Sequence, residues 1–137
     1  MSGNEKCLSK KEIVLTQNAP APIGPYSQAV AVKACQGFVF CSGQIAINPA
    51  NGQIESQDVV AQSKQVMQNL QAVVEASGAK MSQVVKTTIF LKSMGDFPKV
   101  NEVYGGYFSS NPPARSTVEV SRLPKDVLVE VEAIVAL

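Results

Sequence analysis

Apolar residues recur at helical spacing between positions 58 and 77. They stand three, four or seven places apart, at Val59, Val66, Leu70, Val73 and Val74. This spacing lines one face of a helix. Asp58 suits the positive N-terminal end of such a helix, and Gly78 suits the left-handed position after its last turn. The pattern therefore predicts a helix over residues 58–77.

A second helical pattern follows at residues 97–108. Its apolar face carries Phe97, Val100, Tyr104, Tyr107 and Phe108. Asp96 is placed to cap the N-terminus, and Pro98 is tolerated because it falls in the first turn. Gly105 and Gly106 each cost about 1 kcal/mol relative to alanine inside a helix. Either another segment packs closely against them, or the helix ends early.

Short runs rich in β-branched and aromatic residues alternate with these two helices. We expect strands at residues 12–16, 26–34, 37–42, 84–91, 112–120 and 129–134. The second and third of these runs are close enough to form a hairpin, and three prolines exclude a regular element from the loop at 18–25. The order predicts an α+β fold, with a single-layer mixed β-sheet of about six strands and two helices on one face.

The two C-terminal strands carry charged side chains where a half-buried sheet favours apolar ones. Glu130 and Glu132 alternate with valine and alanine, so the second face of the sheet is mixed rather than purely polar. A mixed face favours association with another subunit. Arg115 alternates with smaller residues on the preceding strand, and we expect Arg115 and Glu130 to meet on one face.

The composition indicates one domain in a reducing compartment. The chain has 137 residues, of which 45% are apolar, enough for a single core. We expect a flexible polar arm at residues 1–10 and one domain at 11–137. Three cysteines without a C-x-x-C pair favour a cytoplasmic protein. A net charge of +1 gives no reason to expect nucleic acid, and no apolar run reaches the roughly 18 residues of a membrane span.

The chain contains no histidine, and this absence removes several mechanisms. Ser-His and Cys-His nucleophilic pairs are excluded, as are metal sites that need imidazole. No glycine-rich phosphate loop is present, so a tightly held nucleotide is not expected. We therefore expect neither a metal nor a cofactor, and chemistry that uses Arg, Glu, Asp, Lys, Tyr, hydroxyl groups or water.

Six segments of the sequence form an ordered series along nearly the whole chain. They are 24–29 (GPYSQA), 42–45 (SGQI), 85–88 (VKTT), 97–108, 114–120 (ARSTVEV) and 130–134 (EVEAI). Together they closely resemble the RidA (YjgF) family of imine deaminases, and the segment around Arg115 is the most specific of them. Thr117 departs from the usual family pattern, in which a cysteine is frequent at this position.

The resemblance implies a chorismate-mutase-like fold, a homotrimer, and active sites in the clefts between subunits. It also implies hydrolysis of small 2-imino acids, 2-iminobutanoate and 2-iminopropanoate, to 2-oxo acids and ammonia without a cofactor. Pyridoxal-phosphate enzymes that dehydrate threonine and serine release these reactive substrates. The matching residues are Arg115 as the carboxylate anchor, Glu130 as the group that positions water, and Tyr26, Ser42, Asn101 and Thr117 as other members of the cleft.

The chemistry of this reaction is consistent with these residues. The planar guanidinium of Arg115 offers two parallel N–H groups to a carboxylate, which a lysine does not. Glu130 is then placed to act as general acid and base on a water that attacks the imine carbon. Gly43 and the backbone near Thr117 would shape the pocket, and Tyr26 would cover the substrate.

Alternatives remain open at this stage. Each residue also has a purely structural interpretation: a surface ion pair for Arg115, a solvated face for Glu130, a turn for Ser42, a cap for Asn101 and a loop anchor for Tyr26. The same clefts would suit a non-catalytic, chaperone-like trimer that binds small carboxylates. Endoribonuclease or translation-inhibitor activity is a third hypothesis, weakened by the lack of histidine and of a basic stripe. A chorismate mutase would need a second cation, for which Arg122 is the candidate.

Overall fold

A computed structural model of the protein describes residues 10–137. Apart from Lys10, which begins the first strand, the arm predicted at residues 1–10 lies outside the described residues. The strands are β1 (Lys10–Val14), β2 (Ala29–Lys33), β3 (Phe38–Gln44), β4 (Ile47–Asn48), β5 (Gln53–Ile54), β6 (Val84–Leu91), β7 (Ala114–Glu119) and β8 (Val129–Ala136). The α-helices are α1 (Val59–Ala76) and α2 (Phe97–Gly105), and short 3₁₀ turns span Met81–Gln83, Met94–Asp96 and Pro124–Asp126.

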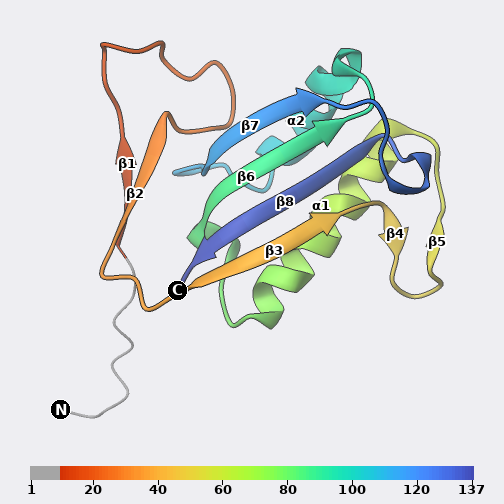
Figure 1. Cartoon of the computed structure of the whole chain (residues 1–137), viewed down its shortest axis with the longest axis horizontal. Helices are drawn as coiled ribbons and strands as arrows, with labels where there is room; N and C mark the ends of the chain where they lie inside the picture. Colours follow the sequence, from red (N-terminus) through yellow and green to blue (C-terminus); the bar gives the residue numbers. More distant parts are fainter. Residues whose placement is uncertain (1–9) are drawn as a thin grey trace.

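Four strands form the main sheet, in the order β3-β8-β6-β7 (Figure 1). β6 and β7 run parallel, whereas β8 is antiparallel to both β3 and β6. Two smaller sheets stand apart, one of β1 and β2 and one of β4 and β5. A parallel pair needs a crossover connection, and α2 lies within the connection from β6 to β7. The crossover therefore places α2 directly behind the strand that carries Arg115.

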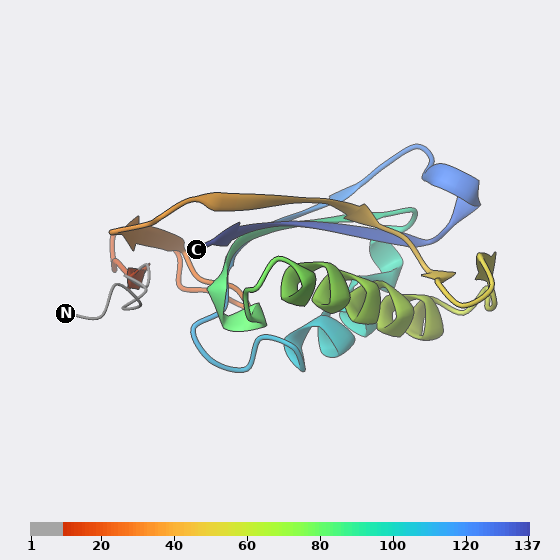
Figure 2. The ribbon, with the colours of Figure 1, turned by 90° about the horizontal axis from the view of Figure 1, so that it is seen from below.

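Both helices cover the same face of the main sheet and leave the other face open (Figure 2). α1 packs against β8, β3 and α2. Asp58 caps α1 by accepting a hydrogen bond from the N–H of Ala61, and Gly78 follows the helix with a φ of 87°. The most deeply buried core residues include Val66, Leu70, Ile89 and Val129. The predicted α+β fold, with two helices on one face of a mixed sheet, is confirmed.

Strand pairing differs from the sequence prediction in two respects. The sequence predicts about six strands in one sheet, but the main sheet of the described chain has four because β1 and β2 form a separate pair. The predicted hairpin of residues 26–34 and 37–42 is wrong, since β2 pairs with β1 and β3 pairs with β8. Leu137 exchanges backbone hydrogen bonds with Gln36 and Gly37. The residue after β8 thus bonds to the backbone groups at 36–37 that would form the turn of the predicted hairpin.

The glycine pair predicted inside the second helix lies at its end. α2 stops at Gly105 rather than at residue 108, and Gly106 is its C-cap. The next N–H group, that of Tyr107, bonds to the carbonyl of Tyr104 in a tighter turn. A Cβ on Gly105 would lie 3.5 Å from Cγ of Pro25. The pair therefore marks both an early helix end and the close approach of a loop.

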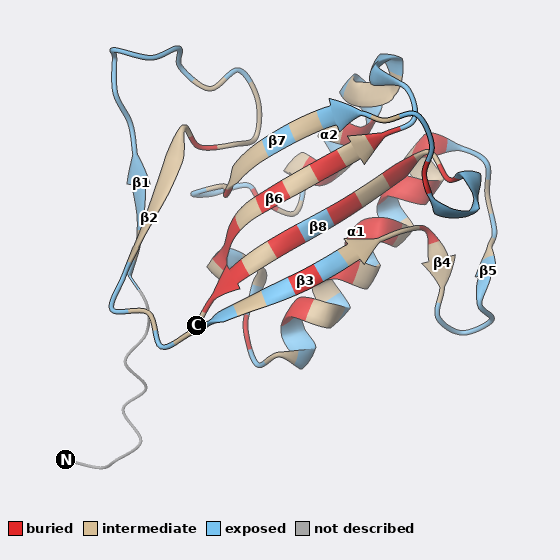
Figure 3. Cartoon of the chain, in the orientation of Figure 1, coloured by how far each residue is buried: buried red, intermediate tan, exposed pale blue. Residues whose placement is uncertain are grey.

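Exposed or half-buried positions alternate with buried ones along the strands of the main sheet (Figure 3), and several of the exposed residues on the open face are apolar. Phe40 is 74% exposed, Phe38 51% and Val118 41%. The rings of Phe38 and Phe40 have centroids 6.2 Å apart. Glutamate side chains share this face, so the mixed character predicted from the alternation on the last strand is confirmed.

Candidate functional site

Arg115 lies at the start of β7, on the helix-covered face of the sheet. The register pairs it with Thr87 of β6, which pairs in turn with the buried Ala133 of β8. Directly paired residues point to the same face. The guanidinium donates a 2.7 Å hydrogen bond through Nη1 to Oδ1 of Asn101 on α2. The fold thus brings together the arginine and the asparagine that the sequence predicts.

Three aromatic rings surround this guanidinium. The Cζ atom of Arg115 lies 5.3 Å from the ring centroid of Tyr26, 5.3 Å from that of Phe97 and 5.0 Å from that of Tyr104. Cations are attracted to aromatic faces, and more strongly where water is removed. Burial lowers the pKa of Arg115, against the raising effects of Tyr104 and Tyr26, but an arginine stays charged at neutral pH.

No carboxylate among residues 10–137 forms an ion pair with Arg115. A partly desolvated cation without a protein anion favours an anionic ligand, because such a ligand supplies the missing countercharge. The guanidinium opens onto a cavity of about 500 Å³ whose wall includes Ile23, Tyr26, Phe97 and Thr117. The geometry and the charge together indicate a site for a small anion with an apolar portion.

Thr117, a residue of this wall, has an unusual hydroxyl. It follows Arg115 by two residues on β7, so both side chains point to the same face. Its Oγ1 is the one buried side-chain oxygen or nitrogen in the described chain that has no hydrogen-bond partner. The residues Gly24, Tyr26, Asn101, Arg115 and Thr117 are called the arginine half-site below.

The loop that carries Gly24 and Tyr26 lies directly against the arginine. A Cβ on Gly24 would stand 3.4 Å from Nδ2 of Asn101 and 3.6 Å from Nη2 of Arg115, so the loop backbone is in contact with both groups. The N–H of Tyr26 donates to the carbonyl of Gly24, and the N–H of Ile23 donates to the hydroxyl of Tyr26. These bonds hold the Tyr26 ring at one side of the cavity.

Glu130 lies on β8, next to the end of β3 that contains Ser42 and Gly43. A Cβ on Gly43 would stand 2.5 Å from Oε1 of Glu130, so the glycine leaves room for the carboxylate. Burial, and secondly the charge of Glu132, raises the pKa of Glu130 above its usual value. A carboxyl group with a raised pKa is suited to exchange protons nearer neutral pH. The residues Ser42, Gly43 and Glu130 are called the glutamate half-site.

Within one chain the two half-sites face opposite sides of the sheet. The prediction that Arg115 and Glu130 meet on one face is wrong. Arg115 pairs with Thr87 of β6, whereas Glu130 pairs with Phe90, three residues further along the same strand. Because side chains alternate along a strand, an offset of three residues places the two charged groups on opposite faces. Arg115 lies on the α2 side, and Glu130 lies on the open face.

The sequence pattern predicts two aromatic residues of the site only as members of the apolar face of the second helix. Phe97 and Tyr104 do pack in the core, but both rings also contact the guanidinium of Arg115. Phe97, Asn101 and Tyr104 stand at positions i, i+4 and i+7 of α2, so they share one helix face. A polar residue between two aromatic residues on that face is the signal that identifies them.

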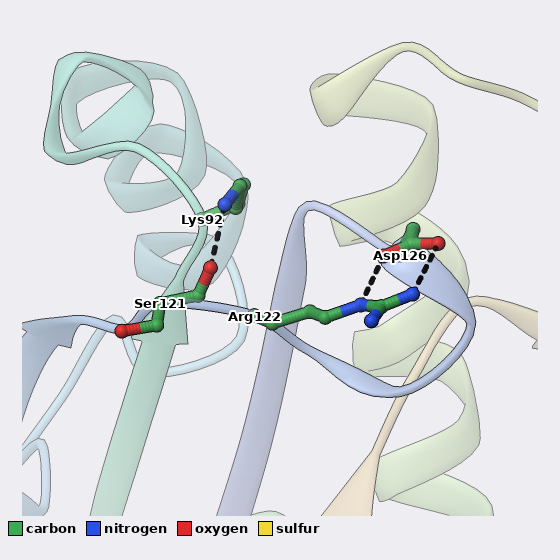
Figure 4. A network of polar contacts seen from close by, with 4 residues as sticks. All are labelled: Lys92, Ser121, Arg122 and Asp126. Atoms are coloured by element: carbon green, nitrogen blue, oxygen red, sulfur yellow. Dashed lines mark hydrogen bonds and ion pairs between the residues drawn. The ribbon is translucent and has the colours of Figure 1, made fainter.

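Arg122, the candidate second cation, lies outside the cavity. It stands in the connection between β7 and β8, where its exposed Nε donates a 2.8 Å hydrogen bond to Oδ1 of Asp126 (Figure 4). Nearby, Lys92 donates to the backbone carbonyl of Ser121. Within one chain Arg122 therefore does not supply the second cation beside Arg115 that a dicarboxylate of the chorismate type would need.

Two further features are absent from residues 10–137. No three His, Cys, Asp or Glu side chains gather there closely enough to hold a metal ion. Neither α1 nor α2, nor any other helix in that range, is long and apolar enough to cross a membrane.

The fold and the arginine half-site define a small α+β protein whose cavity contains a cation without a countercharge in residues 10–137. Residues 16–137 match the family model described as endoribonuclease L-PSP. The chain therefore belongs to this family, which is the RidA (YjgF) family. The resemblance seen in the sequence motifs is confirmed.

Individual relatives agree with this assignment over nearly their full length. The chain is 52% identical over 124 residues to a RutC family protein of Pyrococcus horikoshii, covering 90% of this chain and 96% of that protein. It is 48% identical over 124 residues to the 2-iminobutanoate/2-iminopropanoate deaminase of Escherichia coli, covering 88% and 94% of the two chains. The solved structure of E. coli TdcF with bound serine has a TM-score of 0.70 at 40% identity, covering 92% of this chain and 98% of that one.

Proposed function

We propose that the protein hydrolyses small 2-imino acids, among them 2-iminobutanoate and 2-iminopropanoate, to 2-oxo acids and ammonia. The observation that carries this proposal is the Arg115 guanidinium, which opens onto the cavity and has no ion-pair partner in residues 10–137. Its planar fork suits a carboxylate. Two relatives support the choice of ligand, since one is named for this activity and another was solved with serine, a small carboxylic acid.

A complete site requires groups from two chains. Arg115 and Glu130 of one chain face opposite sides of the sheet. We infer that the arginine half-site of one chain meets the glutamate half-site of a neighbouring copy. A homotrimer closes such a head-to-tail contact into three equivalent sites. The exposed Phe38, Phe40 and Val118 on the open face support its burial against another copy.

In this site Arg115 binds the substrate carboxylate and fixes the position of the imine carbon. Glu130 of the neighbouring copy takes a proton from water while the water oxygen bonds to that carbon. The C=N double bond becomes a single bond, and its nitrogen takes up a proton. In the resulting carbinolamine the amino nitrogen takes up a second proton and the hydroxyl gives its proton to the carboxylate of Glu130, so the C=O bond forms as the C–N bond breaks to release ammonia.

A coupled assay tests the reaction. A threonine dehydratase releases 2-iminobutanoate, and the protein should speed the appearance of 2-oxobutanoate and ammonia. Arg115→Ala should abolish the acceleration, and Arg115→Lys should lose most of it because an ammonium has no planar fork. Full acceleration by Arg115→Ala would contradict the proposal. Binding of 2-oxobutanoate without acceleration would favour the non-catalytic carboxylate-binding trimer instead.

Mixing two inactive variants tests where the site forms. When Arg115→Ala and Glu130→Gln chains are refolded together in equal amounts, about one third of the interfaces in mixed trimers, and about one quarter of all interfaces, should contain both intact groups. Recovery of a similar fraction of wild-type activity supports a site shared between copies. If mixed assemblies form but stay inactive, the shared site is wrong.

A further inference from the structure

Beneath Arg115, a buried pair of hydroxyl groups connects the strand to the helix. The hydroxyl of Tyr104 on α2 lies 2.7 Å from Oγ1 of Thr87 on β6. Tyr104 is 1% exposed and Thr87 is fully buried. Thr87 is also the residue directly paired with Arg115 in the β6–β7 register. Thr87 is therefore next to Arg115 in the sheet, and its hydroxyl holds the Tyr104 ring that contacts the guanidinium.

Packing alone does not require these hydroxyl groups. Valine at position 87 and phenylalanine at position 104 would fill nearly the same space, without the cost of removing two polar groups from water. The pair is satisfied only because each hydroxyl is the partner of the other. Burial raises the pKa of Tyr104 to about 12, so its phenol stays neutral and the bond does not depend on charge. What the pair adds is a fixed position for the Tyr104 ring.

The guanidinium depends on such support for its orientation. Arginine has a long side chain with many rotamers, and Arg115 donates to one side chain of the described residues, Asn101. Besides the Gly24 loop, its contacts include the three rings, of which Tyr104 is the closest and the most deeply buried. Tyr104 is itself packed against Phe108, with ring centroids 4.8 Å apart. The ring is therefore a rigid surface under a flexible side chain.

We propose that the Thr87–Tyr104 pair positions Arg115, holding its free N–H groups toward the cavity so that they bind a carboxylate without prior reordering. This inference rests on the proposed function, since Arg115 is the group that binds the substrate. Neither Thr87 nor Tyr104 touches the substrate in this account. Both act through the orientation of the guanidinium.

Thr87→Val, Tyr104→Phe and the double variant test the proposal. Each single change leaves one buried hydroxyl unpaired and should destabilise the protein, whereas the double change removes both and should recover most of the stability. Affinity should not recover. In the double variant, KM for the imino acid and the dissociation constant of 2-oxobutanoate should both rise about three- to tenfold, with kcat little changed, because preorganisation is lost.

Two controls separate positioning from simple destabilisation. Ser77→Ala removes a hydroxyl that bonds to the carbonyl of Val74 at the end of α1, and it should alter stability without altering KM. The NMR order parameter of the Arg115 Nε–H group should fall in the double variant and stay unchanged in Ser77→Ala. A stable double variant with wild-type KM, affinity and order parameter overturns the proposal. If Arg115→Ala also binds 2-oxobutanoate normally, the proposed function itself fails.

Discussion

Replacing Thr117 by valine removes one group, the buried hydroxyl that has no hydrogen-bond partner in the described chain. Valine keeps the β-branched shape, so β7 and the cavity wall should be preserved. An unpaired buried hydroxyl costs about 1 to 3 kcal/mol of lost hydration. Thr117→Val should therefore raise the free energy of unfolding of the ligand-free protein by about 1 kcal/mol, taking the lower end of that range.

The same change should weaken binding. Thr117 lines the cavity beside Arg115, and a rotation of its side chain would bring the hydroxyl, buried in the ligand-free chain, to a bound carboxylate. A hydrogen bond to a charged group contributes about 1.5 to 3 kcal/mol, so its loss should weaken 2-oxobutanoate binding about tenfold or more. A single substitution is thus expected to stabilise the free protein and to weaken its complex.

Urea unfolding at one protein concentration, with and without 2-oxobutanoate, measures both effects. Thr117→Ser is the matched control, because it keeps the hydroxyl and loses only the methyl group; it should bind nearly as well as wild type. The reasoning is refuted if ligand-free Thr117→Val is less stable than wild type, since Oγ1 would then have a partner in the assembled protein.

Three further changes test other parts of the structure. Gly43→Ala puts a methyl group where Glu130 Oε1 lies and should lower kcat about 100-fold through misplacement of the carboxylate, while calorimetry should show 2-oxobutanoate binding retained. Burial and the charge of Glu132 raise the pKa of Glu130, so folding favours the protonated carboxyl group. As the pH rises from the ordinary carboxyl range through that raised pKa, wild type should lose stability relative to Glu130→Gln. Urea unfolding of both proteins over a pH series measures this difference. Lys11→Met removes an ammonium that donates to three backbone carbonyls and should cost roughly 2 kcal/mol in urea melts; an unchanged stability would mean that the ammonium does not fasten β1 to the rest of the chain.

Helix and strand positions follow from local patterns, and strand partners do not. α1 spans Val59–Ala76 where the sequence predicts 58–77, and β6 spans Val84–Leu91 as predicted. Each of these depends on residues a few positions apart. The partner of the segment at 36–37 is Leu137, at the far end of the described chain. No local feature of the sequence at 26–42 shows that Leu137 takes these backbone hydrogen bonds, and so the predicted hairpin is wrong.

The candidate site shows the same division. Motifs identify its members, but the face on which each member lies depends on how β7 and β8 align with β6. For β8 the apolar pattern decides the face: a shift of one residue would bring Glu130 and Glu132 into the core and expose Val129 and Val131, which are now buried. Glu130 is therefore confined to the open face by the packing of its neighbours.

For β7 no such pattern exists, because the residues on its two faces are similarly polar. Ser116 and Val118 on one face are no less suited to burial than Arg115 and Thr117 on the other. Tertiary contacts hold Arg115 on the helix side: its hydrogen bond to the amide oxygen of Asn101 and three aromatic rings stabilise a charge that would otherwise favour water. Core packing thus separates the two charged groups that the proposed chemistry needs together. Under that chemistry, only a second copy of the chain can bring Glu130 to Arg115.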